Sequence, residues 1–532
     1  MRKLPVLIGL LLFPAVTLSQ SAPFCGVVDS IDYPINDLVE GYDDFALYRA
    51  RFGGNHVGLD IGFDHWGDPV HAAAKGRVTL SNIEEWDTEK GVVIVEHTFP
   101  DGTIAYTLYG HMEETDTIKF PQVGQCVDQD TVLGGIGWPS RGRPHLHFEA
   151  RRMLPNEGGP GYVTTNPLDE GWYHPLDFIH LWRIKLLPGF VNAMSFKSVP
   201  GLPPVMLDSG RYALASGNVL EIVNSPGGDV LWRLETDGVI TGLAGLPGER
   251  VVAHTRNGEV FTLQNGRYTA LWTVEGLDEP FVKLGETLIF VTSGGGLEAY
   301  DPTGAQLWAL PPVSSSERVT QFAASSQQVA LGVRRDEGGV LWRLVDETGQ
   351  VQFEATFVQQ PVAVPAWDGS WMGLDGTQFK RFTDGTNHTY GSIGVVPGRT
   401  ATATVDVVGN TYLYMGDLAN TLMAVNPVGE VLWRVNYPMP SSSLPPLMDT
   451  GNGCLLYTLG TNGVLSSFAT ASGALVNQIE VYAGGSRNSS PRARVLDVDQ
   501  NEMIRAGSGF LSLVTLDGWA LDSPEAAECR LG

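Results

Sequence analysis

A repeated pattern from about residue 205 to the C-terminus constrains the fold more than any other feature of this sequence. Each unit combines a glycine, an alternating strand-like segment, a polar turn with glycine, and a strand that often contains Leu-Trp. The clearest copies run from Gly217 to Trp232, Gly258 to Trp272, Gly296 to Trp308 and Thr421 to Trp433. The period is about 40 residues, the length of one four-stranded propeller blade. We therefore expect a β-propeller of about seven or eight blades over residues 205–532.

An alternative interpretation of these repeats is a pair of β-sandwiches with accidental similarity. The regular spacing of the Leu-Trp pairs favours the propeller. In that fold the tryptophans are expected to fill space between strands as large apolar side chains, rather than to bind a ligand.

Length and composition agree with an all-β protein of more than one domain. A chain of 532 residues is too long for one ordinary domain. Hydrophobic residues make up 43% of it and charged residues only 17%, so a substantial core is expected. The 64 glycines and 33 prolines occur mostly singly, which favours short strands and tight turns over long helices.

The charge balance excludes one class of partner. With 59 acidic and 34 basic residues, the chain has a formal net charge of −25. Nucleic-acid binding depends on Lys and Arg that neutralise phosphates, so no nucleic-acid partner is expected. An acidic surface favours a neutral or cationic target.

The N-terminus has the pattern of an export signal. Arg2 and Lys3 precede an apolar run from Leu4 to Leu18, and small residues follow it. The run is shorter than the roughly 20 residues of a membrane-spanning helix. We expect residues 1–22 to be removed as a signal peptide, leaving a protein without a membrane span. Such a protein would be secreted or lie in the periplasm or cell envelope.

The four cysteines suit an oxidising compartment. Cys25 and Cys126 lie in the first part of the chain, and Cys454 and Cys529 lie in the second. Cys25–Cys126 and Cys454–Cys529 are plausible disulfides, although connectivity does not follow from sequence. None of the four has a Cys-x-x-Cys neighbour, which argues against zinc ligation by cysteine.

Histidines mark a separate domain before the repeats. Nine of the eleven lie between His56 and His180. Short alternating segments such as 91–97, 103–109 and 145–149 predict a compact antiparallel β-domain. Pro-Gly sequences near residues 188 and 200 indicate a linker, so this domain is expected over residues 23–195.

Two pairs of residues in this domain suggest a metal site. His56 and Asp60 are four residues apart, and His145 and His147 are two apart in a predicted strand. Side chains two apart on a strand share one face, so His145 and His147 can line one cavity. Neutral imidazole and carboxylate are good zinc ligands, and three protein ligands with a water are typical of a catalytic zinc site.

The segments around these residues resemble the M23 (LytM/lysostaphin-like) metallopeptidases, which cut peptides in bacterial cell walls. The resemblance covers roughly residues 50–180, about a quarter of the chain. The segments that carry it are Asn55-His56-Val57-Gly58-Leu59-Asp60-Ile61, residues 67–78, Tyr109-Gly110-His111-Met112 and Pro144-His145-Leu146-His147-Phe148-Glu149.

This resemblance implies an antiparallel β-sheet metallopeptidase domain that binds one Zn²⁺ ion. It implies ligation by His56, Asp60 and His147, with His111 and His145 acting on the water and the transition state. A histidine near neutrality is suited to accept and return a proton. The sequence has no His-Glu-x-x-His helix, so the glutamate-based metalloprotease mechanism is not expected.

Other residues of the region carry weaker expectations. Packed or solvated side chains without a site role are expected at His65, His71, His97 and His174, and turn-forming roles at Asp64 and Asp68. Arg141-Gly142-Arg143 stands where the M23 proteins more usually have a Ser/Thr-Gly turn. Substrate preference near that loop therefore stays open.

Three functions follow from these patterns. The first is a secreted zinc endopeptidase acting on peptidoglycan peptides, with the propeller as a targeting module or a binder of a protein or glycan. The second is a non-catalytic cell-wall binder or regulator, although such relatives typically lack one or more ligands. The third uses the resemblance of the repeats to quinoprotein (PQQ-like) propellers. Since Cys454 and Cys529 are far apart, the adjacent cysteine pair of those dehydrogenases is missing, and no propeller cofactor is expected.

Overall fold

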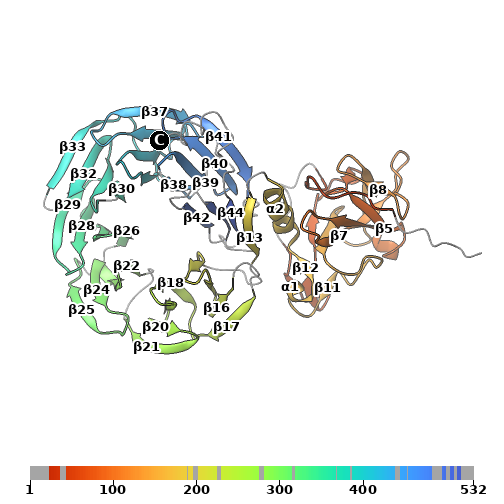
Figure 1. Ribbon diagram of the computed structural model, residues 1–532, viewed down its shortest axis with the longest axis horizontal. Coiled ribbons are helices and arrows are strands. Elements are labelled where there is room, and N and C mark those ends of the chain that lie inside the picture. The colour runs from red at the N-terminus through yellow and green to blue at the C-terminus, as the bar shows by residue number, and fades with distance from the viewer. Residues whose placement is uncertain are drawn as a thin grey trace, which may run out of the picture.

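The structure is a computed structural model with two parts, a small β-domain and a ring of four-stranded sheets (Figure 1). It describes residues 23–35, 44–187, 190–195, 202–224, 229–274, 281–313, 318–366, 368–383, 386–437, 444–451, 453–481, 494–498, 504–508 and 512–516. The predicted signal peptide, residues 1–22, lies outside this range. Among the described residues, no helix has the length and apolar character needed to cross a membrane.

The first domain is built almost entirely from short strands. Its elements are β1 (Tyr48–Arg49), β2 (Gly54–His56), β3 (Leu59–Ile61), β4 (Pro69–His71), β5 (Gly76–Asn82), η1 (Asp87–Glu89), β6 (Gly91–Thr98), β7 (Ile104–Glu113), β8 (Cys126–Val127), β9 (Val132–Ile136), β10 (Leu146–Arg151), β11 (Tyr162–Val163), α1 (Pro167–Glu170), β12 (Trp172–Tyr173) and α2 (Pro175–Lys185).

One antiparallel sheet dominates this domain. Its strands lie in the order β12-β10-β7-β6-β5-β8. Strand β3 pairs with the first half of β10, whereas β12 pairs with the last two residues of β10. The central strands are buried: Val92 to Val95 of β6 are fully covered, as is every residue of β10. Residues 92–95 are all valine or isoleucine, and such β-branched side chains pack well in a sheet that is buried on both faces. Their composition therefore favours the strand β6. The antiparallel β-domain expected from the sequence is confirmed.

A disulfide joins the N-terminal segment to this sheet. Cys25 and Cys126 are bonded, with their Cα atoms 5.3 Å apart and a separation of 101 positions in the sequence. This confirms the first predicted pair. The second predicted pair includes Cys529, which lies outside the described residues.

The second part consists of eight sheets of four antiparallel strands within the described residues, which confirms the predicted propeller and sets its blade number. Seven sheets use consecutive strands. They are β14 (Val205–Met206), β15 (Tyr212–Ser216), β16 (Val219–Val223), β17 (Val230–Glu235); β18 (Ile240–Leu246), β19 (Arg250–Thr255), β20 (Glu259–Gln264), β21 (Arg267–Thr273); β22 (Val282–Leu284), β23 (Thr287–Thr292), β24 (Gly296–Tyr300), β25 (Gln306–Leu310); β26 (Arg318–Ala324), β27 (Gln328–Arg334), β28 (Val340–Asp346), β29 (Val351–Phe357); β30 (Val362–Pro365), β31 (Trp371–Asp375), β32 (Gln378–Thr383), β33 (Thr386–Ser392); β34 (Thr402–Val405), β35 (Thr411–Tyr414), β36 (Thr421–Val425), β37 (Val431–Asn436); and β38 (Leu447–Asp449), β39 (Leu455–Leu459), β40 (Val464–Ala469), β41 (Leu475–Glu480). The short helix η2 (Ser293–Gly295) precedes β24.

The eighth sheet closes the ring with strands from both ends of the repeat region. It has the order β13-β44-β43-β42, from β13 (Phe190–Ser195), β42 (Arg494–Val498), β43 (Ile504–Ser508) and β44 (Ser512–Leu516). The sequence interpretation assigned 190–195 to the first domain and began the propeller at 205. In the structure β13 is a propeller strand, because pairing it with β44 completes the last blade and removes two open sheet edges.

Four tryptophans of the repeats pack against a glycine of the next blade: Trp232, Trp272, Trp308 and Trp433. The ring of Trp308 lies over Gly349, where an added Cβ would be only 2.7 Å from Trp308 Cδ2. Trp308 Nε1 also donates a hydrogen bond to the Glu347 carbonyl oxygen, at 2.8 Å. The same arrangement joins Trp272 to Gly304. The repeating Leu-Trp thus contributes its tryptophan to blade packing, whereas Leu271 and Leu307 point outward and are 64% and 52% exposed.

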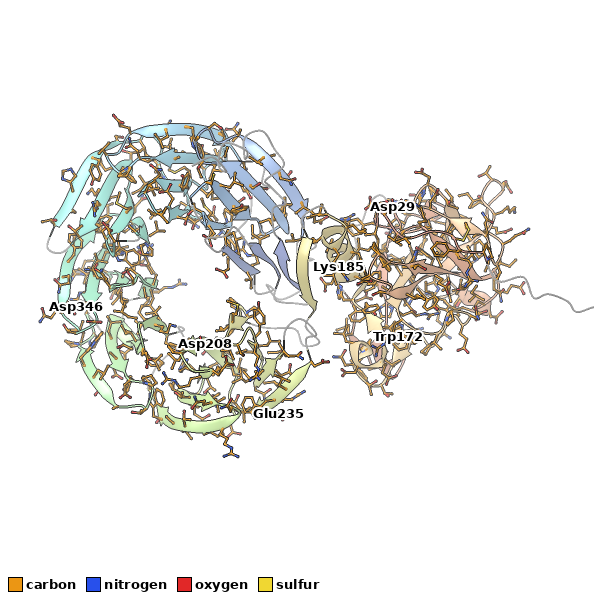
Figure 2. All side chains as sticks on the ribbon, viewed as in Figure 1. Asp29, Trp172, Lys185, Asp208, Glu235 and Asp346 are labelled. Carbon is orange, nitrogen blue, oxygen red and sulfur yellow. A yellow bond between two sulfur atoms is a disulfide. The ribbon has the colours of Figure 1, made fainter. Side chains whose placement is uncertain are left out.

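Helix α2 connects the first domain to the ring (Figures 1 and 2). Ile184 is fully buried in an apolar cluster with Leu455 and Tyr457 of the propeller. Arg183 Nη1 donates to Glu480 Oε2 at 3.0 Å, and Tyr33 Oη donates to the same carboxylate oxygen at 3.2 Å. The two parts therefore share both an apolar and a polar contact.

Candidate metal centre

Three strands bring His56, Asp60 and His147 together. His56 ends β2, Asp60 is the middle residue of β3, and His147 lies in β10. Antiparallel pairing of β3 with β10 places Asp60 directly opposite His147. Gly58 is required between the first two, because an added Cβ there would be 2.7 Å from His147 Nε2.

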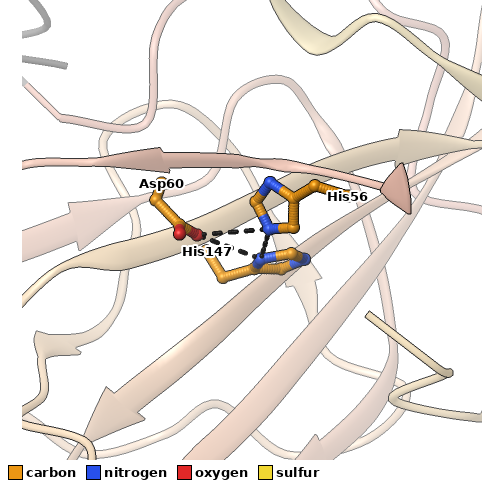
Figure 3. Close-up of side chains that lie close together, drawn as sticks. All are labelled: His56, Asp60 and His147. Atoms are coloured by element: carbon orange, nitrogen blue, oxygen red, sulfur yellow. Dashed lines mark hydrogen bonds and ion pairs between the residues drawn. The ribbon is translucent and has the colours of Figure 1, made fainter. Parts of the chain in front are cut away.

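The ligand atoms of these three residues form a tight triangle (Figure 3). His56 Nε2 lies 3.0 Å from His147 Nδ1 and 3.4 Å from Asp60 Oδ1, and His147 Nδ1 lies 3.3 Å from Asp60 Oδ1. Zinc ligands bound at about 2.0–2.1 Å in a tetrahedron stand about 3.3 Å from one another. Both the spacing and the donor types of the triangle therefore fit a zinc ion.

Buried carboxylates orient both histidines from behind. His147 Nε2 lies 3.0 Å from Glu149 Oε1, and His56 Nδ1 lies 3.2 Å from Asp44 Oδ2. The contact of His147 with Glu149 is a hydrogen bond and holds a proton on His147 Nε2, whereas His56 Nδ1 and Asp44 lie at ion-pair distance without hydrogen-bond geometry. The other nitrogen of each ring, Nδ1 of His147 and Nε2 of His56, faces Asp60. Such outer carboxylates are usual behind metal-binding histidines.

His111 and His145 lie beside the triangle. Their rings meet edge to face, with centroids 4.7 Å apart. His111 Nδ1 donates to the carbonyl oxygen of Glu89 and His145 Nδ1 to that of Arg143, each at 2.7 Å. In the neutral rings Nε2 is therefore the proton acceptor, and that of His145 lies 3.7 Å from Asp60 Oδ1.

The pKa values show that the triangle favours a cation. Burial opposes ionisation of Asp60, but the hydrogen bond with His147 and the charges of the neighbouring histidines hold the pKa of Asp60 well below its usual range. Burial works against a charge on His147 as well, yet hydrogen bonds with Asp60 and Glu149 raise its pKa to about 10. Burial, together with the charges of His145 and His147, lowers the pKa of His111 to about 3. His111 is thus a neutral ring beside a site that stabilises positive charge.

The triangle opens into a cavity of about 870 Å³. His111 and His145 line the same cavity, together with aromatic residues that include Phe52, Trp86 and Tyr162. The ring of Trp86 lies where a side chain at residue 110 would be, because a Cβ on Gly110 would be 2.3 Å from it. Of the three residues of the triangle, Asp60 is the most exposed to this cavity, with 18% of its side chain accessible.

The structure brings together all five residues that the sequence singled out, His56, Asp60, His111, His145 and His147. His97 and His174 are buried away from the triangle, as was expected for packed histidines. Sequence reasoning missed the supporting roles of Asp44 and Glu149. Glu149 lies two residues after His147 on a strand, and this spacing could have indicated that the two side chains share one face. The sequence around Asp44 gave no such signal.

A buried His-Asp-His triangle, open to a peptide-sized cavity on a β-sheet, defines a candidate metallohydrolase domain, and the ring beside it is a β-propeller. Comparison with protein families agrees. Residues 54–160 match the family described as Peptidase family M23, and residues 215–371 match the family described as Outer membrane protein assembly factor BamB. The first domain is therefore similar to M23 peptidases, and the repeats that follow it are similar to those of BamB.

Three solved structures are similar to part of this chain. BamB from Moraxella catarrhalis is 18% identical, with a TM-score of 0.43 over 62% of this chain and 97% of that one. The computationally designed Ika8 protein is 12% identical, also with a TM-score of 0.43 over 62% of this chain, and 98% of its own length is covered. The C-terminal WD40 domain of Sif2 is 10% identical, with the same TM-score and coverage of 62% and 96%. No curated protein matches the chain.

Proposed function

We propose that the protein is a secreted zinc metalloendopeptidase that hydrolyses amide bonds in peptidoglycan peptides. The observation that carries this proposal is the triangle of His56, Asp60 and His147. Its ligand atoms are 3.0–3.4 Å apart, and a buried carboxylate lies behind each histidine ring. The match of residues 54–160 to peptidase family M23 supports the reaction class.

His111 and His145 are proposed as the catalytic residues beside the metal. When bound, zinc polarises the scissile carbonyl and lowers the pKa of a water ligand toward about 7. Because Nδ1 of each histidine is engaged by a carbonyl oxygen, Nε2 is the atom that can accept a proton and return it to the leaving amine. The protonated ring would also stabilise the negative charge that develops on the carbonyl oxygen.

The remaining chain is proposed to serve export and targeting. Residues 1–22 are proposed as a signal peptide, 23–187 as the peptidase domain, and the propeller as a module that binds a protein or glycan partner. The BamB-like repeats support a binding role for the propeller. Under this proposal the protein acts outside the cytoplasm, in the periplasm, cell envelope or medium.

Zinc content and cell-wall hydrolysis, measured together, test the proposal. The mature protein is expected to hold one zinc ion and to release soluble fragments from purified walls. His147→Ala is expected to lose both properties. His71→Ala is the matched control, because His71 lies on β4 outside the cavity lining, and it should keep both. Wall binding without zinc or hydrolysis would contradict the proposal and favour a non-catalytic cell-wall binder.

A further inference from the structure

Arginines are concentrated around the cavity of an otherwise acidic protein. Arg49, Arg51, Arg141 and Arg143 all line it, although the chain has a net charge of −25. The acidic side chains in the lining are those of Asp60, which belongs to the triangle, and Glu89, which accepts a hydrogen bond from Ser140. The walls of this cavity therefore have the opposite charge to the protein as a whole.

Two of these arginines have acidic partners and two do not. Arg49 pairs with Asp44 at 3.0 Å and Arg143 with Asp64 at 2.7 Å. Arg51 and Arg141 are exposed, and neither forms an ion pair or a side-chain hydrogen bond within the part of the chain that the structure describes. Their charges are thus available to a ligand in the cavity.

Aromatic stacking relates Arg51 to the triangle. The Arg51 guanidinium lies 5.4 Å from the centre of the Phe52 ring, and Phe52 stacks on Tyr162 with centroids 4.4 Å apart. Tyr162 in turn contacts His56, with centroids 5.1 Å apart. A ligand group held by Arg51 would therefore lie two aromatic rings away from a residue of the triangle, on the side of His56.

The second group of arginines lies on the side of His145. Arg143 is 4.8 Å from the centre of the Phe63 ring, and Phe63 stacks on His145 with centroids 5.4 Å apart. Arg141 is in the same loop, two residues earlier. Positive charge therefore flanks the triangle at two places, one beyond His56 and one beyond His145.

We propose that this cavity selects peptides that carry a free carboxylate close to the scissile bond, which Arg51 binds on the His56 side of the triangle or Arg141 binds on the His145 side. A guanidinium group matches a carboxylate with two parallel hydrogen bonds, and a glycine-only peptide presents no such side chain. The inference rests on the proposed peptidase function and narrows it to anionic peptides rather than neutral glycine bridges.

Binding of two matched peptides tests this selection. The probes are Gly-Ala-Glu-Ala-Gly and Gly-Ala-Gln-Ala-Gly, each with an amidated C-terminus and a neutral fluorescent dye, titrated with the full-length zinc-loaded protein and with the metal-free protein. We expect the glutamate peptide to bind about tenfold more tightly than the glutamine peptide at low salt. Equal affinity for both peptides, or no measurable binding of either, would overturn the inference.

Variants assign the preference to particular residues. Arg51→Gln and Arg141→Gln are each expected to reduce the preference about threefold, and the double variant to abolish it. Both side chains are exposed and have no acidic partner, so these changes should not affect folding. Arg152→Gln is the control, because Arg152 is exposed on the same domain but does not line the cavity. A double variant that keeps the full preference would refute the assignment.

Hydrolysis of purified walls, measured in parallel, separates this inference from the proposed function. Hydrolysis with no preference for the glutamate peptide would overturn the inference and leave the peptidase function standing. A clear preference without hydrolysis would support the inference and contradict the peptidase function.

Discussion

The substitution Glu149→Gln removes one negative charge from behind the metal triangle while keeping the size of the side chain. Glu149 is fully buried. It accepts hydrogen bonds from His147 Nε2 at 3.0 Å, from Arg151 Nη1 at 3.0 Å and from Trp172 Nε1 at 2.8 Å. Burial opposes ionisation of Glu149, but the hydrogen bonds and charges of these donors outweigh burial and lower the pKa of Glu149. The carboxylate is therefore charged at neutral pH.

Two effects of the substitution differ in size and in cause. Losing an outer carboxylate behind a metal-binding histidine typically weakens metal binding about 10- to 100-fold, which is about 1.4–3 kcal/mol. Arg151, also fully buried, loses its counter-charge. Breaking a buried ion pair costs about 3–5 kcal/mol. We expect about 3 kcal/mol, because Arg151 keeps its hydrogen bond to the Leu154 carbonyl oxygen at 2.7 Å.

The two effects require separate assays. Competition with a chromophoric chelator measures the zinc dissociation constant, and urea unfolding of the metal-free protein measures stability. Glu96→Gln is the control: Glu96 is a carboxylate on β6 that pairs with Arg77 at 2.7 Å, is 22% exposed and does not contact the triangle. It should change zinc affinity less than twofold. A Glu149→Gln protein whose zinc affinity stays within twofold of the wild type would refute the role assigned to this carboxylate.

Three further predictions concern other parts of the molecule. Burial lowers the pKa of His97 from 6.5 to about 4. Because the unfolded chain binds the proton more readily, His97 contributes about 3 kcal/mol to the free energy of unfolding above pH 6.5, and this contribution is lost as the pH falls toward 4. A wild-type melting temperature with the same pH slope as that of His97→Gln would contradict this. Gly349→Ala should destabilise the propeller by about 2 kcal/mol more than Gly210→Ala, because both glycines have positive φ but only Gly349 lies against Trp308. Equal shifts of the two variants in urea unfolding would contradict the packing of Trp308 on the next blade. Free zinc at about a thousand times its dissociation constant should stabilise the peptidase domain by about 4 kcal/mol, and a calorimetric transition that zinc does not move would contradict a folded-state metal site.

Local patterns predicted much of the architecture. Period-two alternation identified the strands of the first domain, and the recurring Leu-Trp identified the propeller, since each blade repeats one supersecondary unit. The blade number was predicted only within a range. Closure of the ring decides it, because the last blade combines β13 with three strands more than 290 residues later in the sequence.

The five candidate site residues were also identified from local spacing. His145 and His147 share a strand face by their spacing, and the pattern around His56 and Asp60 resembled a known peptidase family. Neither signal could reveal Asp44, which reaches His56 from a segment outside any strand. The four arginines around the cavity come from two segments, 49–51 and 141–143, about 90 residues apart, so their common location was not visible in the sequence.

The sequence by itself determined the type of secondary structure, the repeat and the identity of the candidate metal ligands, because each depends on residues a few positions apart. Only the tertiary structure decided how His56, Asp60 and His147 meet at 3.0–3.4 Å, which carboxylates orient them, and which charges surround the cavity. These depend on the pairing of strands that are distant in the chain. The register of β3 against β10 is set by the packing of the whole sheet rather than by either strand alone.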